Sequence, residues 1–328
     1  MSYFNSYPFY HGIMFHHLHD NKMHKSGQGS ISVNNYYKII DFIGEKNILD
    51  ADDFLERLKI NKLEKKNVCL TFDDSLKSQF DLGKKLLNSI KRKAFFFINS
   101  SMFKGKNNKL ELYRYFRTNC FLSIEEFYNL FFKQAEDYLN INIDKKIQNK
   151  NYKIYGYNLK EWRRNFPYFS KNDIKFRIAR DNILSSKKYD LIMKNLFKIK
   201  KFNFKKEEKN LFFSEENIID LKKSGHEVGL HSHSHPFLIS KFSFKKQMYE
   251  YSTNKNILEK ILRNYKIKSM SHPCGSYNRN TLKVLKKLNI EIGFKQIMKI
   301  DKNMKKINNS NLEIARHDSP AIAKMLKI

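Results

Sequence analysis

Short apolar runs alternate with segments of helical apolar spacing near the start of the chain. An apolar run at 67–72 is followed by helical spacing at 75–91 and by a second apolar run at 94–99. Runs of this length are typical of buried strands, whereas apolar residues three and four positions apart indicate one face of a helix. The sequence therefore predicts a parallel βαβ unit with a right-handed crossover, in which Asp74 or Ser75 is the N-cap of the helix.

The same alternation precedes this unit and resumes after residue 210. Strands are predicted at 10–17, 267–276, 290–294 and 312–318, and helices at 36–43, 51–60, 214–224, 242–264 and 280–288. Counting all of these segments gives six or seven βα units. Alternation of this kind predicts an α/β fold with a parallel barrel or a closed, barrel-like sheet.

Residues 104–210 break this alternation. Helical apolar spacing at 110–139 and 174–202 comes with many aromatic and lysine residues, while Gly, Pro and Val are scarce. We therefore predict a mostly helical insertion of unknown role at 104–210, and a body made of 1–103 and 211–328. Its aromatic residues could line a groove for a sugar or a nucleic acid. Aromatic residues at helical spacing are more often part of a core, and we favour that interpretation.

The formal charge of +30 suggests an anionic partner. The spread of the lysines along the chain does not indicate which class of partner it is. Lysines are spread along the whole chain together with Asn, Ile, Phe and Tyr, and no aromatic-basic motif of a nucleic-acid-binding module is visible. A solvated, lysine-rich surface is the favoured interpretation, and no specific nucleic acid is expected. The positive field can still attract anionic sugars, nucleotide-linked substrates or an anionic membrane surface.

Cysteine usage and the first residues bear on the compartment. Cys69, Cys120 and Cys274 lie far apart without a CxxC pair, so neither a disulfide framework nor a cysteine zinc cluster is predicted. Residues 1–10 lack a basic segment followed by an uninterrupted apolar run, and no later run is long enough to span a bilayer. We expect a soluble, cytoplasmic protein, and peripheral contact with a membrane surface is compatible with its charge.

Two adjacent carboxylates, Asp73 and Asp74, follow the apolar run at 67–72. We expect them at the C-terminal end of a strand, where α/β folds place their chemistry because the strand holds side chains rigidly beside an open loop. Neighbouring carboxylates repel each other unless a cation or a shared proton relieves them. A bound metal is the simplest relief.

His231 and His235 form a second candidate group. They are four residues apart and share a face in either a helix or a strand, and Pro236 favours an extended or turn setting. In an extended backbone His233 would share that face too. Two imidazoles with one carboxylate make a zinc-type catalytic site that leaves a position open for water. The same ligands accept iron, cobalt or nickel.

Three motifs together resemble the polysaccharide deacetylase family, also called the NodB-homology family or carbohydrate esterase family 4. They are, in order, Thr71-Phe-Asp-Asp74, His231-Ser-His-Ser-His235 and Ser271-His-Pro-Cys-Gly-Ser-Tyr-Asn278. The resemblance covers residues 65–100 and 214–320, with a weaker likeness at 10–60. It implies a distorted (β/α)7 barrel that carries the mostly helical insertion.

The resemblance also implies roles for the residues of the first two motifs. Asp73 is the general base, while Asp74, His231 and His235 hold a divalent metal, for which zinc is the expected ion. Such a cation polarises an amide carbonyl and lowers the pKa of water, and the base removes the proton.

The oxyanion-binding group and the proton donor are expected in the third motif and on the last strand. A backbone N–H of the loop Pro273-Cys274-Gly275 would stabilise the oxyanion. In the family a histidine on the last strand usually protonates the leaving amine. We slightly prefer His317 for this role over its neighbour Arg316, although many relatives have an arginine there.

Some positions depart from the family pattern. His272 occupies roughly the place of an arginine that orients the base, and its role stays open. His233, usually an aromatic position, is a further candidate for the acid, a residue supporting the metal ligands, or a packed histidine. The usual Asp–Trp motif is not visible, because Trp162 lies in the insertion. The histidines at the end of the first strand could approach a metal, but we favour packing or supporting roles for them: His16, His17 and His19.

The resemblance implies a metal-dependent hydrolase that removes an N-acyl group, expected to be acetyl, from an amino sugar. Because no export signal is visible, we expect a glycan precursor as substrate: a nucleotide-linked sugar, a lipid-linked oligosaccharide or a surface-polysaccharide intermediate. Two alternatives stay open. One is hydrolysis of another linear amide at the same metal site, and the other is carbohydrate binding by a catalytically weakened relative.

Overall fold

The computed structural model describes residues 3–105, 109–148, 152, 160, 170–263, 265–296, 298 and 307–328. Trp162 lies outside these residues. The chain divides into two compact units, one made of Met1–Asn108 with Glu208–Ile328 and the other of Lys109–Glu207. No helix in the described part of the chain combines the length and the apolar character needed to cross a membrane.

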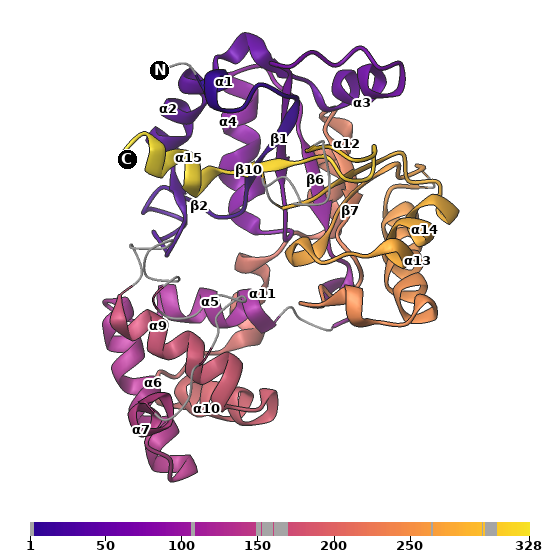
Figure 1. Cartoon of the computed structure of the whole chain (residues 1–328). Helices are drawn as coiled ribbons and strands as arrows, with labels where there is room; N and C mark the ends of the chain where they lie inside the picture. The colour runs from indigo at the N-terminus through magenta and orange to yellow at the C-terminus, as the bar shows by residue number, and fades with distance from the viewer. Residues whose placement is uncertain are drawn as a thin grey trace. The chain divides into compact units, whose positions relative to one another are not determined.

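In the described part of the first unit, seven parallel strands form a barrel. They are β1 (His11–Phe15), β5 (Val68–Phe72), β6 (Phe95–Ile98), β7 (Glu227–Leu230), β8 (Ser269–Ser271), β9 (Ile292–Phe294) and β10 (Arg316–Asp318). Figure 1 labels four of them: β1, β6, β7 and β10. The order of the seven strands is β10-β1-β5-β6-β7-β8-β9, and a parallel bridge between Phe294 and Ile314 links β9 to the segment before β10. The barrel is therefore nearly closed, and the predicted (β/α)7 barrel is confirmed.

Three shorter strands accompany the barrel. β4 (Ile48–Leu49) pairs with β5, while β2 (Leu18–His19) and β3 (Ile31–Ser32) pair with each other in a separate small sheet.

Helices and short helical turns connect the strands of the first unit. The α-helices are α1 (Tyr3–Ser6), α2 (Val33–Ile43), α3 (Ala51–Lys59), α4 (Lys84–Ser89), α12 (Glu215–Lys223), α13 (Phe244–Ile261), α14 (Arg279–Lys287) and α15 (Ser319–Met325). The shorter turns are η1 (Glu45–Asn47), η2 (Gln79–Gly83), η3 (Ser101–Lys104), η5 (Ile239–Lys241) and η6 (Pro273–Gly275), of which η2 is a π-helix. Ser214 and Asn278 begin α12 and α14 with capping boxes, so side chains satisfy backbone N–H groups that the helix leaves unpaired.

The helix predicted at 75–91 does not begin as expected. Asp74 and Ser75 have positive φ angles of 78° and 60°. A helix N-cap has an extended backbone, so neither residue takes that role, and this detail of the prediction is wrong. The helical turns η2 and α4 follow after the left-handed turn that these two residues form.

Both faces of the central barrel strands are buried. Leu70 and Phe96 belong to the cluster that packs the barrel against its surrounding helices. Cys69 and Phe95, one position earlier on the same strands, belong to a second cluster that fills the barrel together with side chains of α3. Burial on both faces explains why these strands are continuous apolar runs without alternation.

The second unit is helical. It contains α5 (Lys109–Asn119), α6 (Ile124–Leu139), α7 (Ile143–Gln148), α9 (Lys171–Ile178), the π-helix η4 (Ala179–Ile183) and α10 (Ser186–Ile199), and α11 (Phe204–Leu211) crosses the boundary between the units. Phe116, Phe127, Phe131 and Phe176 are almost fully buried in it. Their edge-to-face contacts, such as the 4.9 Å between the ring centres of Phe131 and Phe176, make these aromatic residues a core, as we favoured.

Candidate active site

The polar residues singled out in the sequence gather at the C-terminal ends of the barrel strands. Asp73 and Asp74 directly follow β5, and His231 directly follows β7. The carboxyl ends of parallel strands meet at one edge of a sheet, which is where barrels of this kind hold their reactive groups. The loop after β7 then returns His235 to the same place.

Left-handed backbone turns aim these side chains at one point. Asp74 has a φ of 78°, and Ser232 and His235 have φ angles of 60° and 50°. Residues other than Gly are strained in this left-handed backbone conformation. They adopt it where the surrounding structure imposes it, often at functional sites. The turns bring the Asp74 Oδ1 atom to 3.3 Å from the His231 Nε2 atom and 3.2 Å from the His235 Nε2 atom.

The donor set at this point fits a metal ion. The two Nε2 atoms of His231 and His235 are 3.2 Å apart, and Asp74 Oδ1 is buried without a hydrogen-bond partner among the described residues. His231 Nδ1 lies 3.0 Å from the Ser271 carbonyl oxygen. When Nδ1–H donates to this carbonyl, Nε2 keeps its lone pair for a metal. Metal-ligating histidines in proteins commonly donate their other ring N–H in this way. Together, Asp74, His231 and His235 offer three ligand atoms within 4.8 Å of one another.

Arg316 holds Asp73 beside this cluster. The guanidinium donates two hydrogen bonds of 2.7 Å, one to each carboxylate oxygen, and the Ser271 hydroxyl donates a third of 3.0 Å. Burial alone would raise the pKa of Asp73, but the Arg316 charge outweighs it and lowers this pKa to about 2. Asp73 is therefore ionised at neutral pH, with one oxygen 3.8 Å from His231 Nε2.

His16 also lies at this edge, although packing or a supporting role was favoured for it. Phe15 pairs with Phe72, so His16 and Asp73 follow equivalent positions of adjacent strands. His16 Nε2 is 4.0 Å from Asp74 Oδ2, and its Nδ1 is 3.8 Å from Asp318 Oδ1. Its side chain is 25% exposed, so solvent can reach it. The register of the two strands was the signal that could have identified it.

A buried amide links His16 to the base. Gln79, in the π-helix η2, donates from Nε2 to the His16 carbonyl at 2.8 Å and also to the Asp73 carbonyl. The Gln79 side chain thus connects the residues that follow β1 and β5. Irregular π-helical turns are frequent at functional sites, and here the turn presents Gln79 between the two strands.

His317 does not lie among these residues. Successive side chains of a strand alternate in direction, and Arg316 already points to Asp73. The His317 ring lies instead against Tyr7, at 4.5 Å between ring centres, and its Nδ1 is 2.9 Å from the Tyr3 hydroxyl. Burial lowers the pKa of His317 to about 4. The slight preference for His317 over Arg316 at the site is therefore corrected, because the phase of the strand points Arg316 inward.

The remaining predicted residues take positions around the site. His272 is buried, stacks on Tyr277 at 4.3 Å between ring centres, and has its Nε2 atom 2.9 Å from the Leu312 carbonyl oxygen. His233 does not share the face of His231 and His235, because the left-handed turns rotate it away, and its Nδ1 lies 3.0 Å from the Ser100 hydroxyl. The loop Pro273-Cys274-Gly275 is a short helical turn in which Cys274 has a φ of 51°.

Residues 184–293 match the family model described as polysaccharide deacetylase. The resemblance to this family, predicted from the three motifs, is confirmed over these residues. This match includes His231 and His235, and it supports de-N-acetylation of a polysaccharide as the type of reaction. The family is metal-dependent in general, which agrees with the donor set around Asp74.

Two solved structures share the fold. The chain is similar to Streptococcus pyogenes deacetylase PplD in complex with acetate, with 14% identity, a TM-score of 0.52 and coverage of 96% of both chains. It is also similar to IcaB from Ammonifex degensii, with 12% identity, a TM-score of 0.53 and coverage of 98% of both chains. No curated protein matches the sequence.

Metal binding is the first property that the cluster of Asp74, His231 and His235 predicts. Wild-type protein purified and dialysed against zinc should retain about one equivalent, because three converging ligands form a structured site. A His231→Ala/His235→Ala double variant should retain none, whereas a His24→Ala control, altered outside the cluster, should match wild type. Elemental analysis of all three proteins, together with the rise in melting temperature on adding zinc, measures this. Equal metal content in the double variant and wild type would contradict the assignment.

Proposed function

We propose that the protein is a metal-dependent hydrolase that removes an N-acetyl group from an amino sugar in a surface polysaccharide or its precursor. The observation that carries this proposal is the convergence of Asp74, His231 and His235 beside an ionised Asp73, in a barrel of the polysaccharide deacetylase type. Nucleotide-linked and lipid-linked precursors belong to the same proposal, and the positive charge of the chain favours such anionic carriers.

Asp74, His231 and His235 would hold the divalent ion, with zinc as the expected metal and iron, cobalt or nickel as alternatives. When bound, such an ion polarises the amide carbonyl and makes water a stronger nucleophile at neutral pH. The protein contributes the geometry. Asp74 Oδ1 and the two imidazole nitrogens already lie within contact distance of one another, so little rearrangement is needed for binding.

Asp73 is proposed to take the proton of the attacking water. Its oxygen lies next to His231 Nε2, and Arg316 with Ser271 fixes the carboxylate in place. This arrangement orients the base, and it also keeps the base charged over the whole neutral and mildly acidic range. Water adds its oxygen to the acyl carbon, and the carbon–nitrogen bond then breaks to give acetate and a free amine.

His16 is proposed to protonate the departing amine nitrogen. Its Nε2 atom lies 4.0 Å from Asp74 Oδ2 and its Nδ1 atom 3.8 Å from Asp318 Oδ1, so the ring stands at the edge of the cluster. Its partial exposure permits the proton to be replaced from solvent after each turnover. This gives His16 the part that the family resemblance implied for a histidine of the last strand.

The catalytically weakened alternative loses its main support. It rested on the missing arginine at the third motif, and Arg316 supplies an arginine to Asp73 from another strand. Hydrolysis of another linear amide at the same site remains the alternative that a substrate panel separates.

Acetate release tests the proposed function. The zinc-loaded protein, incubated with N-acetylglucosamine oligomers and partly purified bacterial glycans, should release acetate and expose free amines. Asp73→Asn should lower this rate by about 10²-fold or more while zinc content stays at the wild-type level, because the base is lost and the ligands remain. Enzymatic acetate determination and amine labelling give both products. Full activity in the Asp73→Asn variant, or a zinc-loaded wild type without activity on any amino sugar, would contradict the proposal.

The role of His16 is tested through the leaving group. His16→Gln should lower kcat for N-acetylated sugars by about 10²-fold, because an amine cannot leave without a proton. The same variant should hydrolyse p-nitrophenyl acetate nearly as well as wild type, since p-nitrophenolate leaves without protonation. A His17→Gln variant serves as the matched control. Equal losses on the amide and the ester would mean that His16 does not act as the acid.

A further inference from the structure

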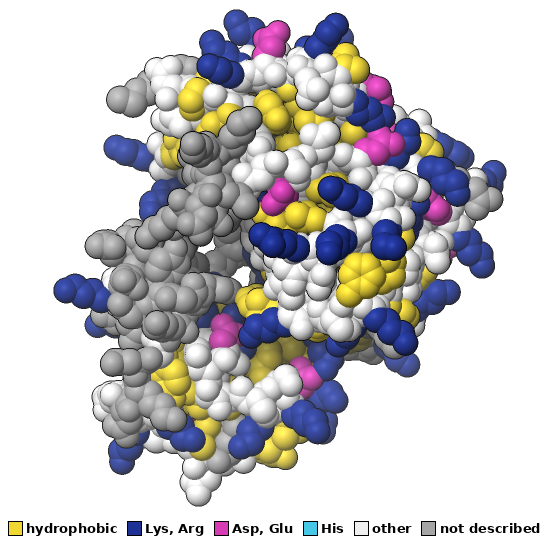
Figure 2. Space-filling model, turned by 45° about the vertical axis from the view of Figure 1, so that its right-hand side comes forward, with side chains coloured by type: hydrophobic (Ala, Val, Ile, Leu, Met, Phe, Trp, Pro, Cys, Tyr) yellow, Lys and Arg dark blue, Asp and Glu magenta, His cyan; other side chains and the backbone are white. Residues whose placement is uncertain are grey.

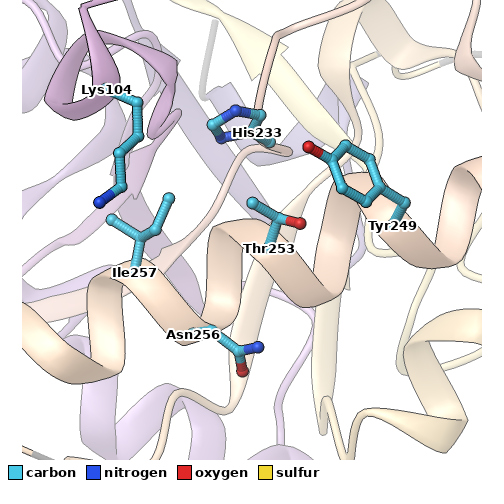
Figure 3. A pocket seen from close by; sticks show the side chains of 6 residues that line it. All are labelled: Lys104, His233, Tyr249, Thr253, Asn256 and Ile257. Atoms are coloured by element: carbon cyan, nitrogen blue, oxygen red, sulfur yellow. The ribbon is translucent and has the colours of Figure 1, made fainter.

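A cavity of about 380 Å³ is lined in part by His233, which lies between the candidate metal ligands in the sequence. It is lined by side chains of η3, the loop after β7 and α13: Lys104, His233, Tyr249, Thr253, Asn256 and Ile257. Figure 3 shows His233 above the helix, with Lys104 and Tyr249 on either side of it. We call this cavity the His233 pocket. Its volume lies within the range of small-molecule sites.

The lining of the His233 pocket combines an aromatic ring with polar groups. Tyr249 is 59% exposed, which is unusual for so large a ring and leaves both its ring and its hydroxyl accessible to a ligand. Thr253 and Ile257 follow Tyr249 at helical spacing, so one face of α13 presents an aromatic, a hydroxyl and an aliphatic group. Sugars offer the same mixture, because their C–H faces are apolar and their hydroxyl groups donate and accept hydrogen bonds.

The charge of the His233 pocket is positive. Lys104 supplies an ammonium group, and none of the six lining residues is acidic. The protein around it has a formal charge of +30, and Figure 2 shows Lys and Arg side chains over much of one face with few acidic ones among them. An ammonium group with no acid beside it in the cavity favours a ligand that carries a carboxylate or a phosphate.

The pocket and the metal ligands share one loop. His233 lies between His231 and His235 in the sequence, and its backbone N–H donates to the Glu250 carbonyl on α13 at 3.1 Å while its carbonyl accepts from Ser101 at 2.9 Å. The loop is thus fixed to α13 and to η3, the two elements that form the pocket walls. The pocket wall and two of the candidate metal ligands therefore belong to the same short segment, residues 231–235.

We propose that the His233 pocket binds an acidic sugar unit, bearing a carboxylate or a phosphate, of the glycan that is deacetylated at Asp73. This inference rests on the proposed function and narrows its substrate class to acidic glycans. Lys104 pairs with the anionic group, Tyr249 packs against the sugar ring, and Thr253 hydrogen-bonds a hydroxyl. The pocket then selects and positions the polymer while the chemistry takes place at Asp73.

Binding to a catalytically silent protein tests this proposal. The zinc-loaded Asp73→Asn protein is titrated calorimetrically with three probes: N-acetylmuramic acid, N-acetylglucosamine 6-phosphate and neutral N-acetylglucosamine. We expect at least one acidic probe to bind about tenfold or more tightly than the neutral one, because a charge-assisted contact contributes that much. The two acidic probes separate a carboxylate from a phosphate as the recognised group.

Two variants assign the binding to the pocket. Added to Asp73→Asn, Lys104→Met should abolish the preference for the acidic probe, and Tyr249→Ala should weaken all binding at this site by about tenfold. The matched control is Lys260→Met, which removes the same charge from an exposed position of α13 outside the pocket. Equal binding of acidic and neutral probes, or equal effects of Lys104→Met and Lys260→Met, would overturn the proposal.

Acetate release keeps the two proposals apart. If wild-type protein releases acetate from neutral oligomers while the pocket variants bind acidic probes normally, the inference fails and the proposed function stands. If no amino sugar is deacetylated but acidic probes bind in a Lys104-dependent way, the proposed function fails and the pocket remains a site for acidic sugars.

Discussion

The bidentate ion pair between Arg316 and Asp73 is the interaction on which the site depends. It joins β10 to β5 across β1, and Gly12 of β1 makes room for it, because a Cβ atom there would lie 2.9 Å from Arg316 Cγ. Both charged groups are almost completely buried, so removing either partner would leave an unpaired charge that costs about 3–5 kcal/mol. The same ion pair therefore holds β10 to β5 and fixes the orientation of the Asp73 carboxylate.

Around this pair, polar groups lie at the ends of parallel strands, and left-handed turns bring their side chains close together. The register of β1 and β5 sets His16 beside Asp73, and the turns at Asp74 and His235 bring a carboxylate and two imidazoles together. Each left-handed residue costs roughly 1–2 kcal/mol, and the convergence of lone pairs adds repulsion. A bound divalent cation would offset both, which gives a physical reason for such strained turns at this place.

Much of this arrangement could be predicted from the sequence, since apolar runs that end in polar residues identify strand ends. Asp73 and Asp74 were found in this way, and His231 was found by its spacing from His235. The positions of His317 and His233 could not be, because the direction of a side chain depends on the phase of the strand and on local turns that no periodicity reveals. Recognising His16 needed the pairing of Phe15 with Phe72, a contact between segments far apart in sequence. The His233 pocket likewise appears only when three distant segments meet.

Hydrolytic deacetylation is tested most directly by measuring whether oxygen from water is incorporated into the acetate product. Zinc-loaded protein and an N-acetylated glycan are incubated in ¹⁸O-labelled water, and the products are analysed by mass spectrometry. Hydrolysis directed by Asp73 predicts acetate that carries ¹⁸O and a glycan that has gained free amines at the same rate. Unlabelled acetate, or a glycan whose N-acetyl groups all remain while the metal site is filled, would contradict hydrolytic deacetylation.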